Sequence, residues 1–151
     1  MAQSTGSAHD LGTVRRVLQL LEESEVSCWI FGGWAEELRA LCPARTHRDI
    51  DLLCRAASFS AVDEMLRTRD LTEIEGKRFH HKRAFLFEGV MVELFLVQRA
   101  GRDFFTSFWG ETRHDWPADT FEHVLDLPVV GAQALADYRR SHDRLARRRP
   151  S

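Results

Sequence analysis

The stretch Gly32-Gly33-Trp34, followed closely by Arg45-Thr46-His47-Arg48-Asp49-Ile50-Asp51, decides how this chain folds. Residues 28–31 lead into the two glycines, and their aromatic and β-branched content predicts a buried strand. Glycine lets the backbone turn sharply and approach a ligand closely, and residues 34–41 then have the spacing of a helix. A strand, a Gly-Gly turn and a helix N-terminus together present free backbone N–H groups to an anion.

Asp49 and Asp51 open a second apolar segment, residues 49–54, which is also expected to be a strand. Residues i and i+2 of a strand point to the same side, so both carboxylates share one face while Ile50 faces the core. Carboxylates at that separation repel each other unless a cation lies between them. An anion site and a cation site would then lie side by side, which suggests an enzyme that handles a metal-bound nucleotide.

Glu93 is the one charged residue in the apolar segment 90–97. A charge inside a central strand costs several kcal/mol unless it is paired or bound to a metal. Two interpretations are therefore open. Glu93 lies on a solvated face or against an arginine, or it lies on a neighbouring strand beside Asp49 and Asp51.

The composition is that of a globular protein. The 151 residues are 44% hydrophobic and 29% charged, and we expect a single domain over residues 10–151 after a flexible tail, residues 1–9. A formal net charge of -2 gives no sign of a nucleic-acid or membrane partner, and no apolar run reaches the roughly 18 residues of a membrane helix. Neither a signal-peptide core nor Cys-x-x-Cys spacing is present, so we expect a cytoplasmic protein with reduced thiols.

The remaining segments predict further helices and strands. We expect a helix over residues 10–24, a helix after Ser58, an edge strand over 71–76, a hairpin of strands 79–87 and 90–97, and a terminal helix over 132–149. Asp10 and Ser58 are placed to cap the first two helices, and Glu88-Gly89 is placed to turn the hairpin. Residues 101–128 lack clean periodicity and are expected to be mostly irregular, with one short strand near 123–127.

The order of these motifs resembles a known family. Gly-Gly-Trp, a short helix and Arg-x-His-x-Asp-Ile-Asp are similar to the signature of small antibiotic nucleotidyltransferases, namely the lincosamide nucleotidyltransferases and the aminoglycoside 2''-adenylyltransferases of the DNA polymerase β-like superfamily. The resemblance is dense over residues 29–53 and looser through residue 97. It implies an α+β fold with a mixed central sheet of about five strands, flanking helices and a C-terminal helix.

The resemblance also implies a reaction. In that superfamily a substrate hydroxyl attacks the α-phosphorus of a nucleoside triphosphate, and pyrophosphate leaves. One or two Mg²⁺ ions would be held by Asp49, Asp51 and Glu93, since Mg²⁺ prefers oxygen ligands shared with phosphates. Gly32 and Gly33 would bring backbone N–H groups to the phosphates, and the expected triphosphate is ATP. Glu93 is the candidate general base as well, and whether it is base, metal ligand or both is open.

Basic and aromatic residues near these motifs have open roles. Arg45 and His47 match the family motif and are expected to contact phosphate or support the site, the alternative being a loop with exposed basic groups. A basic group, His80, His81, Lys82 and Arg83, belongs either to the site or to a solvated strand face. Five aromatic side chains either line an acceptor pocket or complete the core: Phe104, Phe105, Phe108, Trp109 and Trp116.

The expected partners are a nucleoside triphosphate and a small hydroxylated acceptor such as an antibiotic, and a homodimer is one way for a short chain to complete an acceptor pocket. Two alternative functions are open: nucleotidylation of protein or RNA, as in toxin–antitoxin pairs, and nucleotide binding without catalysis. The toxin–antitoxin enzymes usually carry a Gly-Ser turn, unlike Gly32-Gly33, and the presence of all three carboxylates argues against a non-catalytic module.

Overall fold

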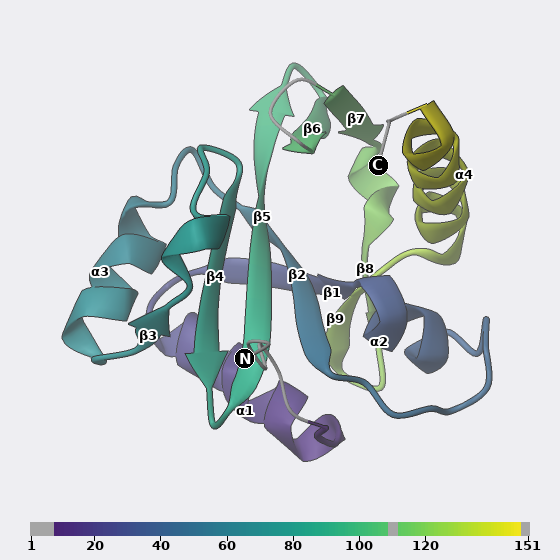
Figure 1. Ribbon diagram of the computed structural model, residues 1–151. Helices are drawn as coiled ribbons and strands as arrows, with labels where there is room; N and C mark the ends of the chain where they lie inside the picture. The colour runs from purple at the N-terminus through teal and green to yellow at the C-terminus, as the bar shows by residue number, and fades with distance from the viewer. Residues whose placement is uncertain (1–7, 109–111, 149–151) are drawn as a thin grey trace.

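Residues 8–108 and 112–148 are described by a computed structural model (Figure 1). The helices are α1 (Leu11–Glu23), α2 (Gly32–Leu38), α3 (Ser60–Thr68) and α4 (Ala132–Arg148), with 3₁₀ turns η1 (Glu75–Lys77) and η2 (Ala118–Thr120). The strands are β1 (Ser27–Phe31), β2 (Asp49–Arg55), β3 (Thr72–Glu73), β4 (Lys82–Phe87), β5 (Val90–Ala100), β6 (Asp103–Phe108), β7 (Thr112–Trp116), β8 (Phe121–Val124) and β9 (Leu127–Val130). The expected tail, residues 1–9, lies outside the described residues except for its last two. Of these, His9 accepts a hydrogen bond from Trp34 Nε1 at 2.9 Å.

The strands form one mixed sheet in the order β3-β4-β5-β2-β1-β9-β8, and β6 and β7 continue it from the end of β5. β2 runs parallel to β5 and β1 parallel to β9, whereas the other pairs are antiparallel. The predicted fold class, a mixed sheet with flanking helices and a C-terminal helix, is confirmed. Within the described residues the sheet has nine strands, more than the expected five or so.

The additional strands lie in the segment that was expected to be irregular, so that expectation is wrong. β6 and β7 form a hairpin that extends β5, and pairing with neighbours, not periodicity, makes them strands. β8 and β9 join at Leu125 and Asp126, which have φ of 52° and 63°. The predicted strand 123–127 therefore spans a turn. Turns of this kind usually carry Asn or Gly, and neither residue is present to mark it.

Helix boundaries follow local capping. Thr13 N donates to Asp10 Oδ1 at 3.2 Å, which confirms the predicted cap of α1. The N-cap of α3 is Phe59, not Ser58, although the Ser58 hydroxyl accepts a hydrogen bond from Ser60 N at 3.3 Å. The helix expected over residues 34–41 runs instead from Gly32 to Leu38, since the backbone turns left-handed at Ala40, with φ of 58°.

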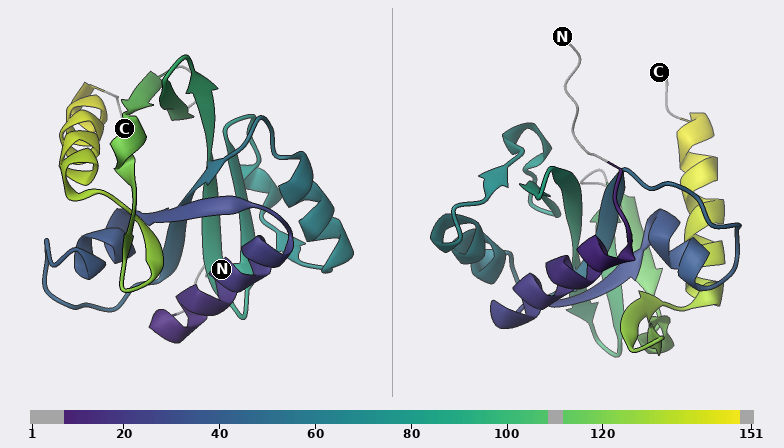
Figure 2. Two further views of the ribbon diagram at one scale, coloured as in Figure 1. Left: turned by 180° about the vertical axis from the view of Figure 1, so that it is seen from behind. Right: turned by 90° about the horizontal axis from the view of Figure 1, so that it is seen from below.

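The arrangement of the layers leaves one face of β2 for the site. α1 covers one face of the sheet, and α3 and α4 lie at opposite ends of the molecule (Figure 2). Ile50 and Leu52 are fully buried in the core, whereas Asp49 and Asp51 are only half-buried, as strand alternation predicts. None of the described helices is both long and apolar enough to span a membrane.

Candidate active site

Three carboxylates meet on adjacent strands. Asp49 and Asp51 lie on β2, and Glu93 lies on the parallel neighbour β5, directly opposite Asp51 in the register. One oxygen from each carboxylate lies within 4.8 Å of the others. Glu93 is only 8% exposed, which excludes a solvated strand face. Glu93 therefore joins the two aspartates, as the second interpretation of the sequence required.

Burial and mutual repulsion set the charges of this cluster. Burial raises the pKa of Asp51, and the charges of Asp49 and Glu93 raise it further. The pKa of Asp49 is raised by burial and then by the charge of Glu93. Burial alone would raise the pKa of Glu93 too, but the hydrogen bond and charge of Lys82 outweigh it and lower this pKa. Three acids at this range favour a cation among them.

The donor set fits a divalent cation. Asp51 Oδ1 is buried, and no described residue donates a hydrogen bond to it. A buried carboxylate oxygen without a partner is unfavourable unless a cation or a donor approaches it. Mg²⁺ takes oxygen ligands and is usually bound by carboxylates together with substrate phosphates. Asp49, Asp51 and Glu93 are the residues that could hold such an ion.

The Gly-Gly turn touches the carboxylates directly. Gly32 has φ of +71°, and a Cβ there would lie 2.6 Å from Asp51 Oδ2, so only glycine permits both this backbone and this approach. Gly33 faces two other predicted residues, since its Cβ would lie 2.8 Å from Arg45 Nη2 and 3.1 Å from His47 Nδ1. The four residues predicted to bind the nucleotide thus surround the start of α2, and their role in binding remains a prediction.

His47 is part of the folded loop and is not an exposed basic group. It is 6% exposed, its Nε2 lies 2.8 Å from Glu37 Oε1, and its ring packs on Trp34 with centroids 4.3 Å apart. Glu37 also accepts a hydrogen bond from Arg45 N at 3.0 Å. The bonds from Arg45 and then His47 lower the pKa of Glu37. The side chain of Arg45 itself is half exposed, as the alternative interpretation expected for this residue.

Two lysines hold Glu93: Lys82, whose role the sequence left open, and Lys77, which sequence reasoning did not assign to the site. Lys82 Nζ lies 2.7 Å and Lys77 Nζ 3.3 Å from Glu93 Oε2. The alternative interpretation, in which Glu93 lies against an arginine, is therefore wrong. A buried glutamate needs a cationic partner. Because Lys77 is far from Glu93 along the chain, the sequence did not indicate that it would be one of the partners. The sequence contained one indication of a special role for these residues: Lys77 and Lys82 are the only two lysines in a chain with many arginines.

The basic group at residues 80–83 divides between two faces of the sheet. Lys82 points to the carboxylates. The next residue, Arg83, is buried, and its Nε donates a hydrogen bond to Asp63 Oδ1 at 2.8 Å. His80 is exposed, and His81 stacks on Phe79 with centroids 5.5 Å apart. Strand alternation thus brings one member of the group to the site.

An aromatic wall adjoins the carboxylates. Phe31, opposite Asp51 in the register, packs edge-on against Tyr138 of α4 and Phe95 of β5, with centroids 5.5 Å and 5.3 Å apart. Burial and then the charges of Asp51 and Glu93 raise the pKa of Tyr138, which therefore stays protonated. Sequence reasoning missed this tyrosine as a site residue, since α4 is far along the chain from β2 and β5.

The aromatic residues of segment 101–128 whose side chains the structure describes lie in different surroundings. Trp116 is fully buried in the core, and Phe104 and Phe105 each lie beneath an arginine guanidinium. Trp109 and the side chain of Phe108 lie outside the described residues. The core interpretation therefore holds for Trp116.

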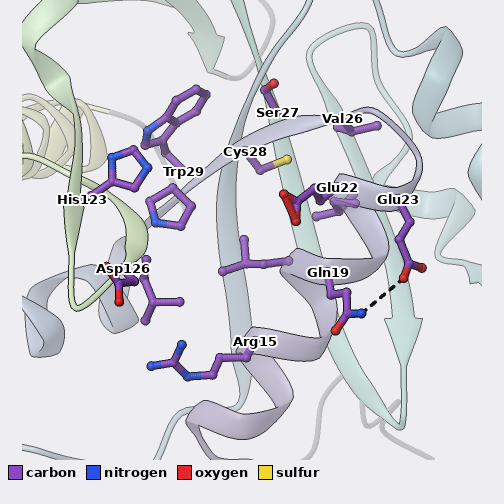
Figure 3. A pocket seen from close by; sticks show the side chains of 14 residues that line it. Arg15, Gln19, Glu22, Glu23, Val26, Ser27, Cys28, Trp29, His123 and Asp126 are labelled. Atoms are coloured by element: carbon purple, nitrogen blue, oxygen red, sulfur yellow. Dashed lines mark hydrogen bonds between the residues drawn. The ribbon is translucent and has the colours of Figure 1, made fainter.

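A pocket of about 670 Å³ lies elsewhere, between α1, β1 and the β8–β9 turn (Figure 3). Its wall carries charges of both signs, among them Arg15, Glu22 and Asp126, beside Cys28 and Trp29. None of the predicted site residues lines it. It is separate from the carboxylate cluster.

This fold is shared with nucleotidyltransferases of known structure. The model of the aminoglycoside-2''-adenylyltransferase family matches residues 13–124, which is most of the chain. The chain belongs to that family, and the resemblance stated from the sequence motifs is confirmed. No curated protein sequence matches the chain at a significant level.

Solved structures share the fold at low sequence identity. The lincosamide antibiotic adenylyltransferase LnuA, bound to lincomycin, is 17% identical with a TM-score of 0.68, over 87% of each chain. The antibiotic-resistance factor ANT(2'')-Ia is 17% identical with a TM-score of 0.62, over 89% of this chain and 72% of that chain. A complex of ANT(2'')-Ia with adenylyl-2''-tobramycin gives a TM-score of 0.60 at 17% identity, over 89% and 76% of the two chains.

Proposed function

We propose that this protein is a Mg²⁺-dependent enzyme that transfers a nucleoside monophosphate, AMP from ATP, to a hydroxyl of a small molecule such as an antibiotic. The observation that carries the proposal is the convergence of Asp49, Asp51 and Glu93 within 4.8 Å. Each of these carboxylates raises the free energy of the others' charged forms, so the cluster favours a cation bound among them.

The residues of the chain have distinct tasks in this mechanism. Asp49, Asp51 and Glu93 would hold Mg²⁺, and the ion would supply positive charge that offsets the negative charge of the triphosphate. Glu93 accepts the proton of the acceptor hydroxyl, whose oxygen forms a bond to the α-phosphorus. The bond from the α-phosphorus to the bridging oxygen breaks, and pyrophosphate leaves. The ion pair with Lys82 keeps Glu93 ionised and thus able to accept a proton.

A small acceptor is supported by the aromatic wall. Phe95 and Tyr138 are partly exposed and pack on the buried Phe31, so they present apolar surface next to the carboxylates. Such surface orients the body of a small molecule while a few polar groups select its reactive hydroxyl. The structural neighbours were solved with lincomycin and with adenylylated tobramycin. Hydroxyl-bearing antibiotics are accordingly the first acceptors to test.

Mass spectrometry of a compound panel tests the proposal. We expect one acceptor to gain the mass of one nucleoside monophosphate after incubation with the protein, Mg²⁺ and an NTP. Glu93→Gln cannot take the proton and should slow this transfer by about 10²–10⁴-fold. An equal rate for Glu93→Gln would remove Glu93 from the mechanism, and no mass gain with any NTP across lincosamides and aminoglycosides would refute the proposed acceptor class.

A further inference from the structure

The only two lysines of the chain converge on one carboxylate oxygen. The sequence contains Lys77 and Lys82, and every other basic side chain apart from histidine is arginine. Both ammonium groups contact Glu93 Oε2, at 3.3 Å and 2.7 Å. Lysine differs from arginine in being a compact charge on a flexible stem, with three donors that can change partner without losing a paired geometry.

The two contacts differ in strength and setting. Lys82 lies on β4 opposite Phe95, its side chain is 17% exposed, and its Nζ lies 5.1 Å from the centroid of the Phe95 ring. Lys77 ends the 3₁₀ turn η1, its side chain is 36% exposed, and its contact is the longer one. Lys82 is thus held by the sheet and a ring, whereas Lys77 reaches Glu93 from a surface turn.

A divalent cation at the carboxylates would lie near both ammonium groups. Like charges at a few ångströms repel, so an ion bound by Glu93 weakens at least one of the two ion pairs. The less firmly held lysine releases first. A metal-bound triphosphate would bring a phosphate tail to this site as a new anionic partner, because Mg²⁺ sites share their ion with phosphates.

We propose that Lys77 exchanges its contact with Glu93 for a contact with the triphosphate when the divalent cation binds, while Lys82 stays on Glu93 as a positioning residue. The inference rests on the proposed function and adds to it a lysine ammonium group that moves from the Glu93 carboxylate to a phosphate. It makes Lys77 a nucleotide-binding residue that the Gly-Gly turn and the Arg-x-His motif do not include.

Opposite changes in two affinities test the exchange. Lys77→Met removes a competitor of the metal, so Mn²⁺ alone should bind about fivefold tighter or more, as expected for one unit charge a few ångströms away in a water-like medium. The same variant should bind inorganic tripolyphosphate, at saturating Mg²⁺, about tenfold more weakly or worse, since a charge-assisted hydrogen bond is lost. Calorimetric titration measures both. A structural defect would weaken both affinities, and that result, or no change, would overturn the inference.

Two matched variants complete this test. Lys77→Arg keeps the charge and should return both affinities toward the wild-type values. Arg78→Met removes a neighbouring charge that pairs with Glu73 and Asp63 instead of Glu93. Both affinities should stay within about twofold, because those two carboxylates already offset the Arg78 charge and exposed ion pairs contribute little. If Arg78→Met reproduces the effect of Lys77→Met, the effect is one of general charge and the exchange is wrong.

Amine labelling of the wild-type protein gives a second readout that needs no variant. Peptide mass spectrometry reports each of the two lysines separately. We expect Mg²⁺ to increase labelling of Lys77, addition of tripolyphosphate to suppress it, and Lys82 to remain protected throughout. Unchanged labelling of Lys77 would overturn the exchange even though metal and tripolyphosphate bind. Failure of Mn²⁺ to bind the wild-type protein at all would instead refute the proposed function.

Discussion

At the scale of single residues, Gly32 links the turn to the metal ligands. Its backbone is left-handed, with φ of +71°, and Asp51 Oδ2 occupies the place where a side chain would begin. These are two separate constraints on one position. Gly101 has a similar φ of +65° but nothing within 4 Å of a built Cβ, so it carries only the first constraint.

Alanine substitutions at these two glycines separate the cost of the left-handed backbone from the cost of the close contact with Asp51. Gly101→Ala should lower the free energy of unfolding by about 1–2 kcal/mol, the usual excess of a left-handed backbone. Gly32→Ala should lower it by at least about 1 kcal/mol more, because overpacking against Asp51 adds to the strain. Denaturant unfolding of both variants measures the difference. Equal losses would mean that Asp51 moves aside freely and that the close approach has no structural role.

Among the elements, β4 connects the site to the periphery. Its alternation sends Lys82 to Glu93 and Arg83 to the opposite face, where Asp63 of α3 accepts from Arg83 Nε at 2.8 Å and from Arg78 Nη2 at 3.0 Å. The Arg83 guanidinium also lies 4.6 Å from the ring of Phe59. The position of the strand that carries Lys82 thus depends on an ion-pair network with α3.

This network predicts a pH dependence of stability. The hydrogen bonds from Arg83 and then from Arg78 hold the pKa of Asp63 below its ordinary value. A carboxyl with a lower pKa in the folded state stabilises the fold above the unfolded-state pKa of about 3.9, and this stabilisation is lost as the pH falls through the folded-state pKa. Asp63→Asn should be less stable than the wild type at pH 7, and the difference should shrink below about pH 4.

Urea unfolding at pH 7, 5 and 3.5 measures this difference. Asp70→Asn serves as a control, since Asp70 is exposed and has no ion pair within the described residues. A difference between Asp63→Asn and the wild type that stays constant with pH would show that the loss arises from packing and not from the charge of Asp63.

Some of these elements could be predicted from the sequence and others could not. Strands with alternating or continuous apolar residues, such as β2 and β5, and the Asp-x-Asp pair within them were read correctly because burial determines both pattern and fold. β6 and β7 were missed because pairing with neighbouring strands, and not periodicity, makes them strands. The strand expected over residues 123–127 was misplaced, because the turn at Leu125-Asp126 divides it between β8 and β9. Lys77 and Tyr138 were missed because each reaches the carboxylates from a distant segment, and spacing along the chain carries no signal for such contacts.

At the scale of the whole molecule, the C-terminal elements β9 and α4 are joined to α2, which begins at the Gly-Gly turn. Arg139 of α4 pairs with Glu36 of α2, and Arg39 donates to the carbonyl oxygens of Val129 and Val130 in β9. These contacts fix α4, and with it Tyr138, beside the strands that carry the carboxylates. The three acids are thus held together by the global fold, and their repulsion lowers global stability when no cation offsets it.

The most direct test of the carboxylate site is the thermal unfolding of wild type and Asp51→Asn with and without Mn²⁺. Because the folded-state pKa of Asp51 is raised, its charge destabilises the fold at neutral pH, so Asp51→Asn should melt at the same temperature or higher without metal. An ion at 100 times its Kd stabilises by about 2.7 kcal/mol, or about 5–10 °C for a chain of this size. The wild type should show this rise, and Asp51→Asn should lose most of it. An equal Mn²⁺-induced rise in both proteins, or none in the wild type, would contradict the assignment of Asp49, Asp51 and Glu93 as the metal site.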